Sequence, residues 1–150
     1  MTRTNARELA CQLVFETGFR HLTAQEALDA LMQDGYYETL KDEADSFSEK
    51  PTDKQLAYIT AIVQGVQARQ TELEGYISRF SVGWSIDRIS RVAVAIMEVC
   101  MYESLYVDDV PVGAAINEAV ELTRRYEDED VVSFVNGILG RFAREVVEQC

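Results

Sequence analysis

The chain has 150 residues, the usual size of one domain, so we expect a single domain over residues 1–150. Hydrophobic residues make up 47% of the sequence and only two residues are proline, which is typical of a compact globular protein and excludes a disordered one. The formal net charge of −12 excludes indiscriminate binding to nucleic acid, because such binding needs a positive surface.

Neither a membrane segment nor a metal site is predicted. No apolar run approaches the roughly 20 residues that cross a bilayer, and residues 1–19 lack the apolar core and cleavage site of a signal peptide, so we expect a cytoplasmic protein. The three cysteines, Cys11, Cys100 and Cys150, show no metal-ligand spacing and are expected to be free thiols. The single histidine, His21, excludes a histidine-rich metal site.

The N-terminal region predicts two helices. Apolar residues recur at spacings of three and four over residues 5–17, and Gly18 is expected to end this helix. Thr23-Ala-Gln-Glu26 is a capping box, in which the threonine hydroxyl accepts from a free backbone N–H and the glutamate reaches back. It opens a second helix, which we expect to run to about Met32 before Asp34-Gly35 stops it.

An acidic segment separates these helices from the next one. Residues 34–53 contain seven acidic residues against two lysines. Residues 36–51 are polar and weakly periodic and predict an exposed linker. Thr52-Asp-Lys-Gln55 is a second capping box, and the helix that it opens is expected to continue to Phe80.

Three further helices are predicted in the second half of the chain. Ser85-Ile-Asp-Arg88 opens one that stops near Tyr106. Asp108-Asp-Val-Pro111 predicts the start of the next, because aspartate can cap a helix and proline suits the first helical position. That helix ends at Tyr126, residues 127–130 fill a connection, and the last helix runs to the C-terminus. No alternating strand pattern or hairpin signal occurs, so the fold class is all-α.

The sequence offers no catalytic arrangement. Nucleophilic catalysis needs a nucleophile with a base and an orienting group. His21 lies in a polar connection and is interpreted as a surface residue, and Asp108-Asp109 is explained as a helix cap. Gly137 and Gly140 follow no strand and precede no lysine–serine pair, so they form no phosphate-binding loop. We therefore predict that the chain is not an enzyme and uses no cofactor.

Some residues in the predicted helices are of unexpected type. Glu103 lies on an apolar stripe, and we expect its carboxylate to cap a neighbouring helix N-terminus, with a contact to a partner as the alternative. Asn117, Asn136 and Gly137 are poor helix formers. They are expected to fix how the last helices pack, the glycine by letting another helix approach and Asn136 by hydrogen bonding to it. Phe134 either packs inside or stands exposed and stacks on a nucleobase.

Three ordered runs resemble the signature of the NusB family of transcription antitermination factors. They are VDDVP at residues 107–111, INEAVEL at residues 116–122 and FVNGIL at residues 134–139. Met101-Tyr-Glu103, Ala6-Arg-Glu8 and Gln12-Leu-Val-Phe15 fit the same pattern, and only residues 36–51 are left unmatched.

The resemblance implies a fold, a function and partners. NusB proteins are all-helical, so we expect about seven helices packed as two helical sub-bundles. They are not enzymes. They bind the boxA element of ribosomal RNA transcripts together with the small-subunit ribosomal protein NusE, within an RNA polymerase antitermination complex that reads through terminators. The resemblance leaves a homodimer open, since relatives include both monomers and dimers.

The resemblance also implies which residues contact RNA. The positions that match the family's RNA contacts are Arg3, Arg7 and Phe134, with Asp130 beside the RNA and Arg124 as a phosphate contact. We expect the N-terminal arginines and the start of the last helix to meet on one exposed face.

Two departures from the family pattern weaken the expected contacts. Thr4 and Asn5 interrupt the N-terminal arginines, and Val92-Ala-Val94 lacks charged residues that relatives carry. The first departure predicts fewer phosphate contacts, and the second weakens an expected polar contact to NusE. We expect weak RNA binding by the chain alone and tight binding only with NusE. The alternative is a protein-only adaptor that keeps the ribosomal partner and has lost RNA recognition. The accessory domain of an RNA methyltransferase is a third class, which we discount because the sequence to Cys150 has no room for a cofactor-binding domain.

Overall fold

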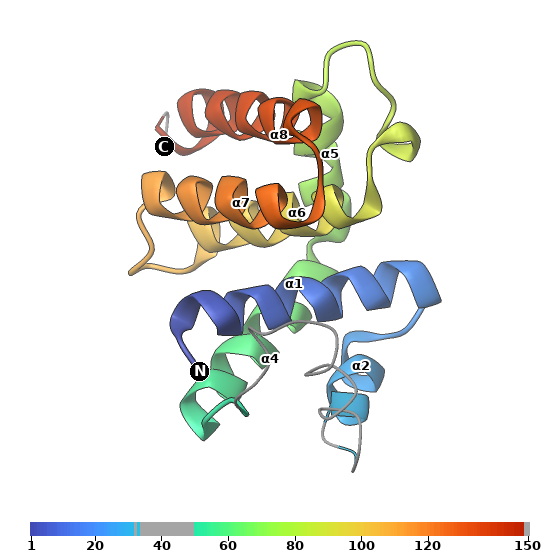
Figure 1. The fold of residues 1–150 in the computed structure, drawn as a ribbon, viewed down its shortest axis with the longest axis vertical. Helices are drawn as coiled ribbons and strands as arrows, with labels where there is room; N and C mark the ends of the chain where they lie inside the picture. The colour runs from blue at the N-terminus through green and yellow to red at the C-terminus, as the bar shows by residue number, and fades with distance from the viewer. Residues whose placement is uncertain (32, 34–49, 149–150) are drawn as a thin grey trace. The chain divides into compact units, whose positions relative to one another are not determined.

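A computed structural model describes residues 1–31, 33 and 50–148 of the chain. It confirms the all-α fold class, with seven α-helices and no strand among the described residues. The chain divides into two compact units, Met1–Gln67 and Ala68–Cys150, each of them a helical bundle (Figure 1). No helix in the described part is both long and apolar enough to cross a membrane.

Unit 1 contains α1 (Arg3–Arg20), α2 (Ala24–Leu31) and nearly all of α4 (Asp53–Ala68). Both predicted capping boxes are confirmed at the starts of α2 and α4. The Thr23 hydroxyl accepts from the backbone N–H of Glu26 at 3.1 Å, and the Glu26 carboxylate accepts from the N–H of Thr23 at 3.0 Å. The backbone hydrogen bond from Thr23 stabilises the ionised carboxylate and so lowers the pKa of Glu26. The second box repeats this pattern, with reciprocal hydrogen bonds at 3.2 Å and 2.9 Å.

Gln67 joins α4 to the start of α2. Its side-chain oxygen accepts from the backbone N–H of Ala24 at 2.6 Å, and its side-chain nitrogen donates to the carbonyl of Leu22 at 3.1 Å. The side chain therefore satisfies two backbone groups that the chain turn would leave without partners.

The prediction that Gly18 ends the first helix is wrong. The helix α1 continues to Arg20 and ends at His21, whose φ of 55° is left-handed and whose backbone N–H bonds the carbonyl of Thr17. A glycine costs a helix only about 1 kcal/mol, which the packing of the preceding turns outweighs. The predicted stop at Asp34-Gly35, and residues 36–49 of the predicted linker, lie outside the described residues.

Unit 2 contains α5 (Gln70–Phe80), α6 (Arg91–Tyr106), α7 (Val112–Tyr126) and α8 (Glu129–Phe142). The helix α6 packs against all three of the others, and α8 packs against α5 and α7 (Figure 1). Buried apolar side chains from all four helices form the core of this unit. The largest of them are Leu73, Ile77, Met97, Met101, Ile138, Leu139 and Phe142.

The predicted single helix through Phe80 is in fact two helices. The chain leaves the helical conformation at Arg69, whose φ and ψ are −115° and 21°. The Arg69 guanidinium lies 4.0 Å from the centre of the Tyr106 ring and 3.8 Å from the Glu72 carboxylate. These contacts accompany the break, and no proline or glycine stands at it in the sequence.

The start of α6 also differs from the prediction. Residues Ile86–Arg88 form a short 3₁₀ turn, and Ile89 is extended and buried. The long helix begins only at Arg91, with Ser90 as its N-cap, because the serine hydroxyl accepts from the backbone N–H of Ala93 at 3.3 Å. Its end at Tyr106 is as predicted.

The starts of α7 and α8 correct two further expectations. Pro111 is the N-cap residue of α7, one position before the first helical residue, and neither preceding aspartate caps the helix. Residues 127–130 are only partly a connection, because Asp128 caps α8 and accepts from the N–H of Val131 at 3.3 Å. The last helix does not continue as an α-helix, since Ala143–Val147 form a π-helical turn, η3.

Candidate nucleic-acid interface

A pocket of about 210 Å³ opens in unit 2, where the connection between α5 and α6 meets the first turns of α8. We call it the Trp84 pocket. Its lining consists of Trp84, Arg88, Ile89, Ser90, Asp130, Val131 and Phe134.

Two aromatic rings form the apolar part of the Trp84 pocket. Trp84 is 56% exposed, and Phe134 is half-buried. Their ring centres are 6.1 Å apart with an angle of 64° between the planes, so the rings meet edge to face. The sequence left open whether Phe134 is buried or exposed; its ring is partly accessible.

The backbone around Trp84 is held in place by Ser81. The buried Ser81 hydroxyl donates to the carbonyl of Trp84 at 3.2 Å, and the Trp84 N–H donates to the carbonyl of Ser81 at 3.2 Å. Gly83, between them, has a φ of 85°, which favours glycine. The exposed indole is therefore attached to a backbone that local hydrogen bonds hold in place.

The polar groups of the pocket have opposite charges. Arg88 and Asp130 are both exposed, and neither side chain makes an ion pair or hydrogen bond with a described residue. Ser90, in contrast, is fully engaged, because its hydroxyl also donates to the Glu127 carboxylate. The pocket therefore combines a mainly apolar surface with one exposed cation and one exposed carboxylate among its lining residues.

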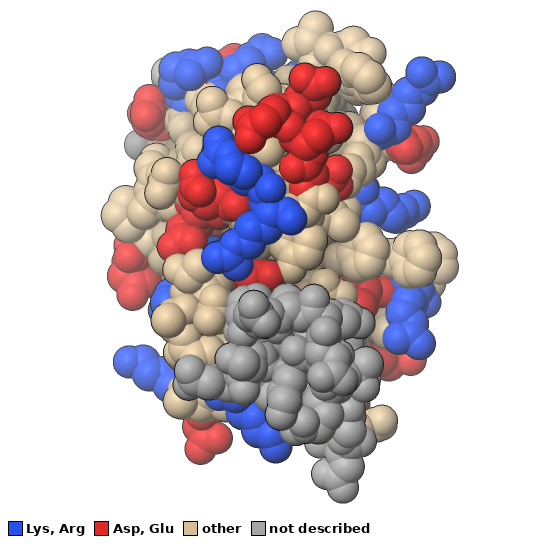
Figure 2. Space-filling view, viewed as in Figure 1, with Lys and Arg blue, Asp and Glu red and all other residues tan. Residues whose placement is uncertain are grey.

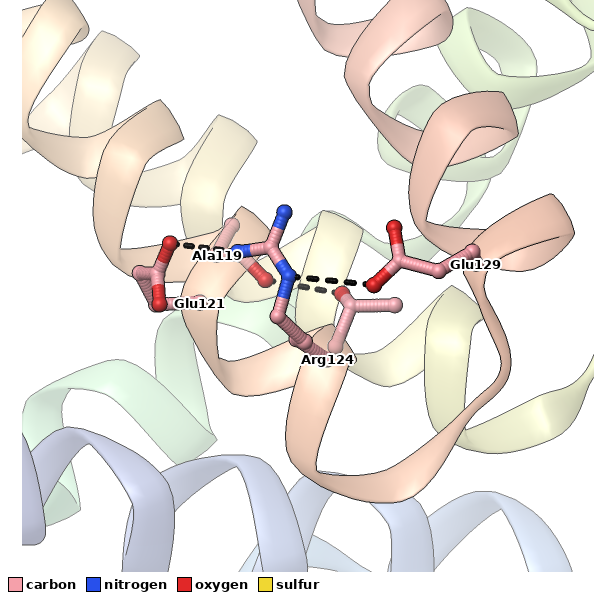
Figure 3. A network of polar contacts seen from close by, with 5 residues as sticks. Ala119, Glu121, Arg124 and Glu129 are labelled. Atoms are coloured by element: carbon pink, nitrogen blue, oxygen red, sulfur yellow. Dashed lines mark hydrogen bonds and ion pairs between the residues drawn. The ribbon is translucent and has the colours of Figure 1, made fainter.

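Arg124 lies at the end of α7 between two carboxylates (Figure 3). Its guanidinium donates to Glu121 at 2.5 Å and to Glu129 at 3.3 Å. These two hydrogen bonds raise the pKa of Arg124 above its usual value. All three side chains are exposed, so the ion pairs are weak and a phosphate can compete for the arginine.

Acidic and basic side chains are mixed on this part of the surface. Figure 2 shows acidic side chains next to arginines over α7 and the start of α8, with no continuous basic patch on the face in view. An anionic ligand on this face would therefore have to be held by particular contacts and not by a broad positive field.

The two N-terminal arginines belong to unit 1 and differ from each other. Arg3 is exposed, and its guanidinium lies 3.9 Å from the centre of the Tyr58 ring. Arg7 is only 8% exposed. Of the two, Arg3 is the more accessible cation for a phosphate, and its cation–π contact orients it.

The residues predicted to have structural roles have different environments. Glu103 is fully buried on α6, as a structural carboxylate would be, although its expected capping role stays a prediction. Asn117 and Asn136 are exposed, and neither side chain hydrogen-bonds to a described residue. A Cβ atom added at Gly137 would meet no atom within 4 Å. Among the described residues no atom of another helix comes close to Gly137, and the roles of Asn117 and Asn136 in helix packing stay predictions.

Trp84 and Arg88 were not predicted as site residues. Arg88 lies in the segment that the sequence predicted to open a long helix, and Trp84 lies directly before that segment. The available signal was an isolated tryptophan beside Gly83, in a segment where apolar residues lose their periodicity. Among the described residues, no group of three or more histidine, cysteine, aspartate or glutamate side chains is placed to hold a metal ion.

Comparison with known proteins gives a consistent result. The sequence profile of the NusB family matches residues 4–144. A transcription antitermination protein NusB from Acetivibrio thermocellus is 35% identical over 144 residues, which cover 96% of this chain and 90% of that protein. A protein of the same name from Clostridium botulinum (strain Loch Maree / Type A3) is 32% identical over 141 residues, covering 94% and 99%.

Solved structures share the fold. A crystal form of T. maritima NusB matches with a TM-score of 0.75 and 26% identity, over 98% of this chain and 94% of that chain. A chain in a crystal structure of a plectonemic RNA supercoil matches with a TM-score of 0.78 over 100% of both chains. Its identity of 21% is low, and this second likeness shows the fold alone.

Proposed function

The chain belongs to the NusB family and is a transcription antitermination protein and not an enzyme, and we propose that it acts by binding boxA RNA of ribosomal RNA transcripts together with the ribosomal protein NusE. In this proposal the pair joins the RNA polymerase antitermination complex in the cytoplasm and helps the polymerase to read through terminators.

The Trp84 pocket is the observation that best supports RNA binding. Phe134 is partly accessible and Asp130 is exposed, as contacts with RNA require, and Trp84 adds a second aromatic surface. Single-stranded RNA is bound in proteins by stacking of its bases on aromatic side chains and by cations near its phosphates. We propose that Arg88, Arg124 and the N-terminal Arg3 supply those cations.

One set of observations favours the protein-only adaptor as a second candidate. Arg7 is buried, Arg124 is paired with two carboxylates, and the net charge is −12. Each of these reduces the positive charge available to phosphates, so the RNA affinity of the chain alone is expected to be low.

Binding of labelled boxA RNA at low and at physiological salt, with and without NusE, distinguishes the two candidates. We expect weak binding by the chain alone, which NusE strengthens at both salt concentrations. A matched RNA with a scrambled boxA sequence is the control and should not respond to NusE. If NusE binds the chain while boxA RNA is not bound at either salt concentration, the protein-only adaptor is the correct function.

A further inference from the structure

We propose that Tyr58 is a positioning residue for RNA binding, because it holds the guanidinium of Arg3 ready for a phosphate of the RNA backbone. The inference rests on the proposed function, in which Arg3 is one of the cations that contact RNA. It adds a residue that acts through another one, since Tyr58 lies on α4 and Arg3 is the first residue of α1. Both residues belong to unit 1.

The first residues of the chain are anchored on the start of α4. Gln55 belongs to the capping box of that helix, and its side-chain nitrogen also donates to the carbonyl of Met1. Thr2 caps α1, because its hydroxyl accepts from the backbone N–H of Asn5 at 3.0 Å. Chain ends are poorly ordered unless such contacts hold them. The backbone that carries Arg3 is therefore held on both sides of that residue.

Tyr58 lies three residues after Gln55 on α4 and contacts the side chain of Arg3. The guanidinium carbon of Arg3 lies over the ring, 3.9 Å from its centre. The ring is half-buried, whereas Arg3 is exposed. A free arginine side chain loses rotamer freedom when it binds a ligand, so a contact that orders the side chain beforehand lowers the cost of binding.

An aromatic ring holds a guanidinium differently from a carboxylate. A carboxylate occupies N–H groups of the guanidinium and offsets its charge, whereas a ring attracts the cation through its π electrons and carries no charge. Within the part of the chain that the structure describes, Arg3 makes no ion pair, and its side chain donates no hydrogen bond. Arg124, in contrast, donates to two carboxylates. The contact with Tyr58 therefore orients Arg3 and leaves its charge available to an anion.

The position of Arg3 in α1 also favours an anionic ligand. This helix has 18 residues, and its first turn contains no acidic residue. The helix dipole is positive at the N-terminus, so it disfavours a cation there in the free protein. A bound phosphate would be attracted by the guanidinium and by the helix end together.

The first experiment measures the affinity of labelled boxA RNA, at saturating NusE, for the unchanged chain, Tyr58→Leu and Tyr58→Phe. Leucine removes the aromatic ring and keeps an apolar side chain, whereas phenylalanine keeps the ring face and is the matched control. We expect Tyr58→Leu to bind RNA about two- to fivefold more weakly, the range of a cation–π contact at an exposed site. Tyr58→Phe should bind as the unchanged chain does. Should Tyr58→Leu fail to fold in thermal unfolding, Tyr58→Met, which also lacks a ring, takes its place.

A double-mutant cycle separates positioning of Arg3 from a general structural role of Tyr58. Arg3→Gln should weaken RNA binding and lower the slope of log affinity against log salt by about 0.7, the value for one phosphate contact in single-stranded nucleic acid. In the Arg3→Gln background, Tyr58→Leu should weaken RNA binding no further, because no guanidinium is left to position. A purely structural role would give the same loss in both backgrounds.

NMR of the free protein tests the contact without RNA. Protons that lie over an aromatic ring are shifted upfield by its ring current, so the δ protons of Arg3 should be shifted in the unchanged chain and in Tyr58→Phe. In Tyr58→Leu they should return to the values of a free arginine side chain. Unshifted δ protons in the unchanged chain would overturn the inference, because the contact would then not hold Arg3 in solution.

The RNA measurements can also overturn the inference while the proposed function holds. They do so if Tyr58→Leu binds RNA as tightly as the unchanged chain, if its loss is the same in both backgrounds, or if Arg3→Gln has no effect on RNA affinity. If no boxA RNA binds to the unchanged chain even with NusE, the proposed function fails, and the inference fails with it.

Discussion

Glu98 is a carboxyl group in the interior of unit 2, on the central helix α6. The residue is 3% exposed, and its oxygen Oε2 has no hydrogen-bond partner among the described residues. Burial, with a smaller contribution from the negative charge of Glu74, raises the pKa of Glu98 from 4.5 to about 8. At neutral pH the group is therefore protonated in the folded protein and ionised in the unfolded chain.

This shift makes stability depend on pH. The folded pKa is the higher one, so between pH 4.5 and about 8 the folded state binds a proton that the unfolded state has lost. The free energy of unfolding therefore falls as the pH rises through this interval. The stability contributed by protonated Glu98 is fully present only below pH 4.5.

The substitution Glu98→Gln should remove this dependence. A glutamine has a similar shape and never ionises, so the variant should be more stable than the unchanged protein at pH 8, by roughly 3 to 5 kcal/mol if the full shift applies. Urea unfolding from pH 4 to pH 8 measures this difference. Glu148→Gln, an exposed carboxyl change, is the control and should alter stability little at any pH in the range. A parallel pH dependence in Glu98→Gln and the unchanged protein would show that Glu98 is not the responsible group.

At the scale of helices, the sequence predicts contacts between residues a few positions apart, and it does not predict contacts between distant segments. The capping boxes at Thr23 and Thr52 act through residues three apart, so the sequence predicts their hydrogen bonds directly. At the break, Arg69 contacts Tyr106, which is far away in the sequence, and no local pattern predicts this contact. The Trp84 pocket was missed for the same reason, because its rings come from two elements that only the fold brings together.

The role of Gly137 cannot be inferred from its type alone, because it depends on which atoms surround it in the fold. Its surroundings among the described residues are open, although the sequence predicted a close approach of another helix there. Asn136, next to it, is exposed as well.

The substitution Gly137→Ala should stabilise the fold. The added methyl group meets no atom within 4 Å, and alanine is favoured over glycine in a helix by about 1 kcal/mol. Thermal unfolding measures the gain, and Gly75→Ala, which is also helical with open surroundings, is a matched control that should gain a similar amount. A loss of stability at position 137 alone would contradict the open environment. Weaker binding of NusE by a stable Gly137→Ala variant would locate the partner surface on α8.

At the scale of the whole molecule, the negative net charge is expected to limit the affinity of the chain alone for RNA. The chain has 14 lysine and arginine residues against 26 aspartate and glutamate residues. Several arginines are also engaged, since Arg69, Arg79 and Arg124 all have a carboxylate within 4 Å. RNA recognition is therefore expected to rely on stacking and on the proposed partner NusE, with a small salt dependence.

The most direct test of the central claim is the affinity of labelled boxA RNA for the complex of this protein with NusE, measured for the unchanged chain and for Phe134→Ala. The proposed role of Phe134 predicts a loss of about tenfold or more, the usual value of a base stacked on an aromatic ring, with NusE binding unchanged. Ser133→Ala, an exposed change in the same turn of α8, should bind RNA as the unchanged chain does. Equal RNA affinity for Phe134→Ala and the unchanged complex would contradict the account.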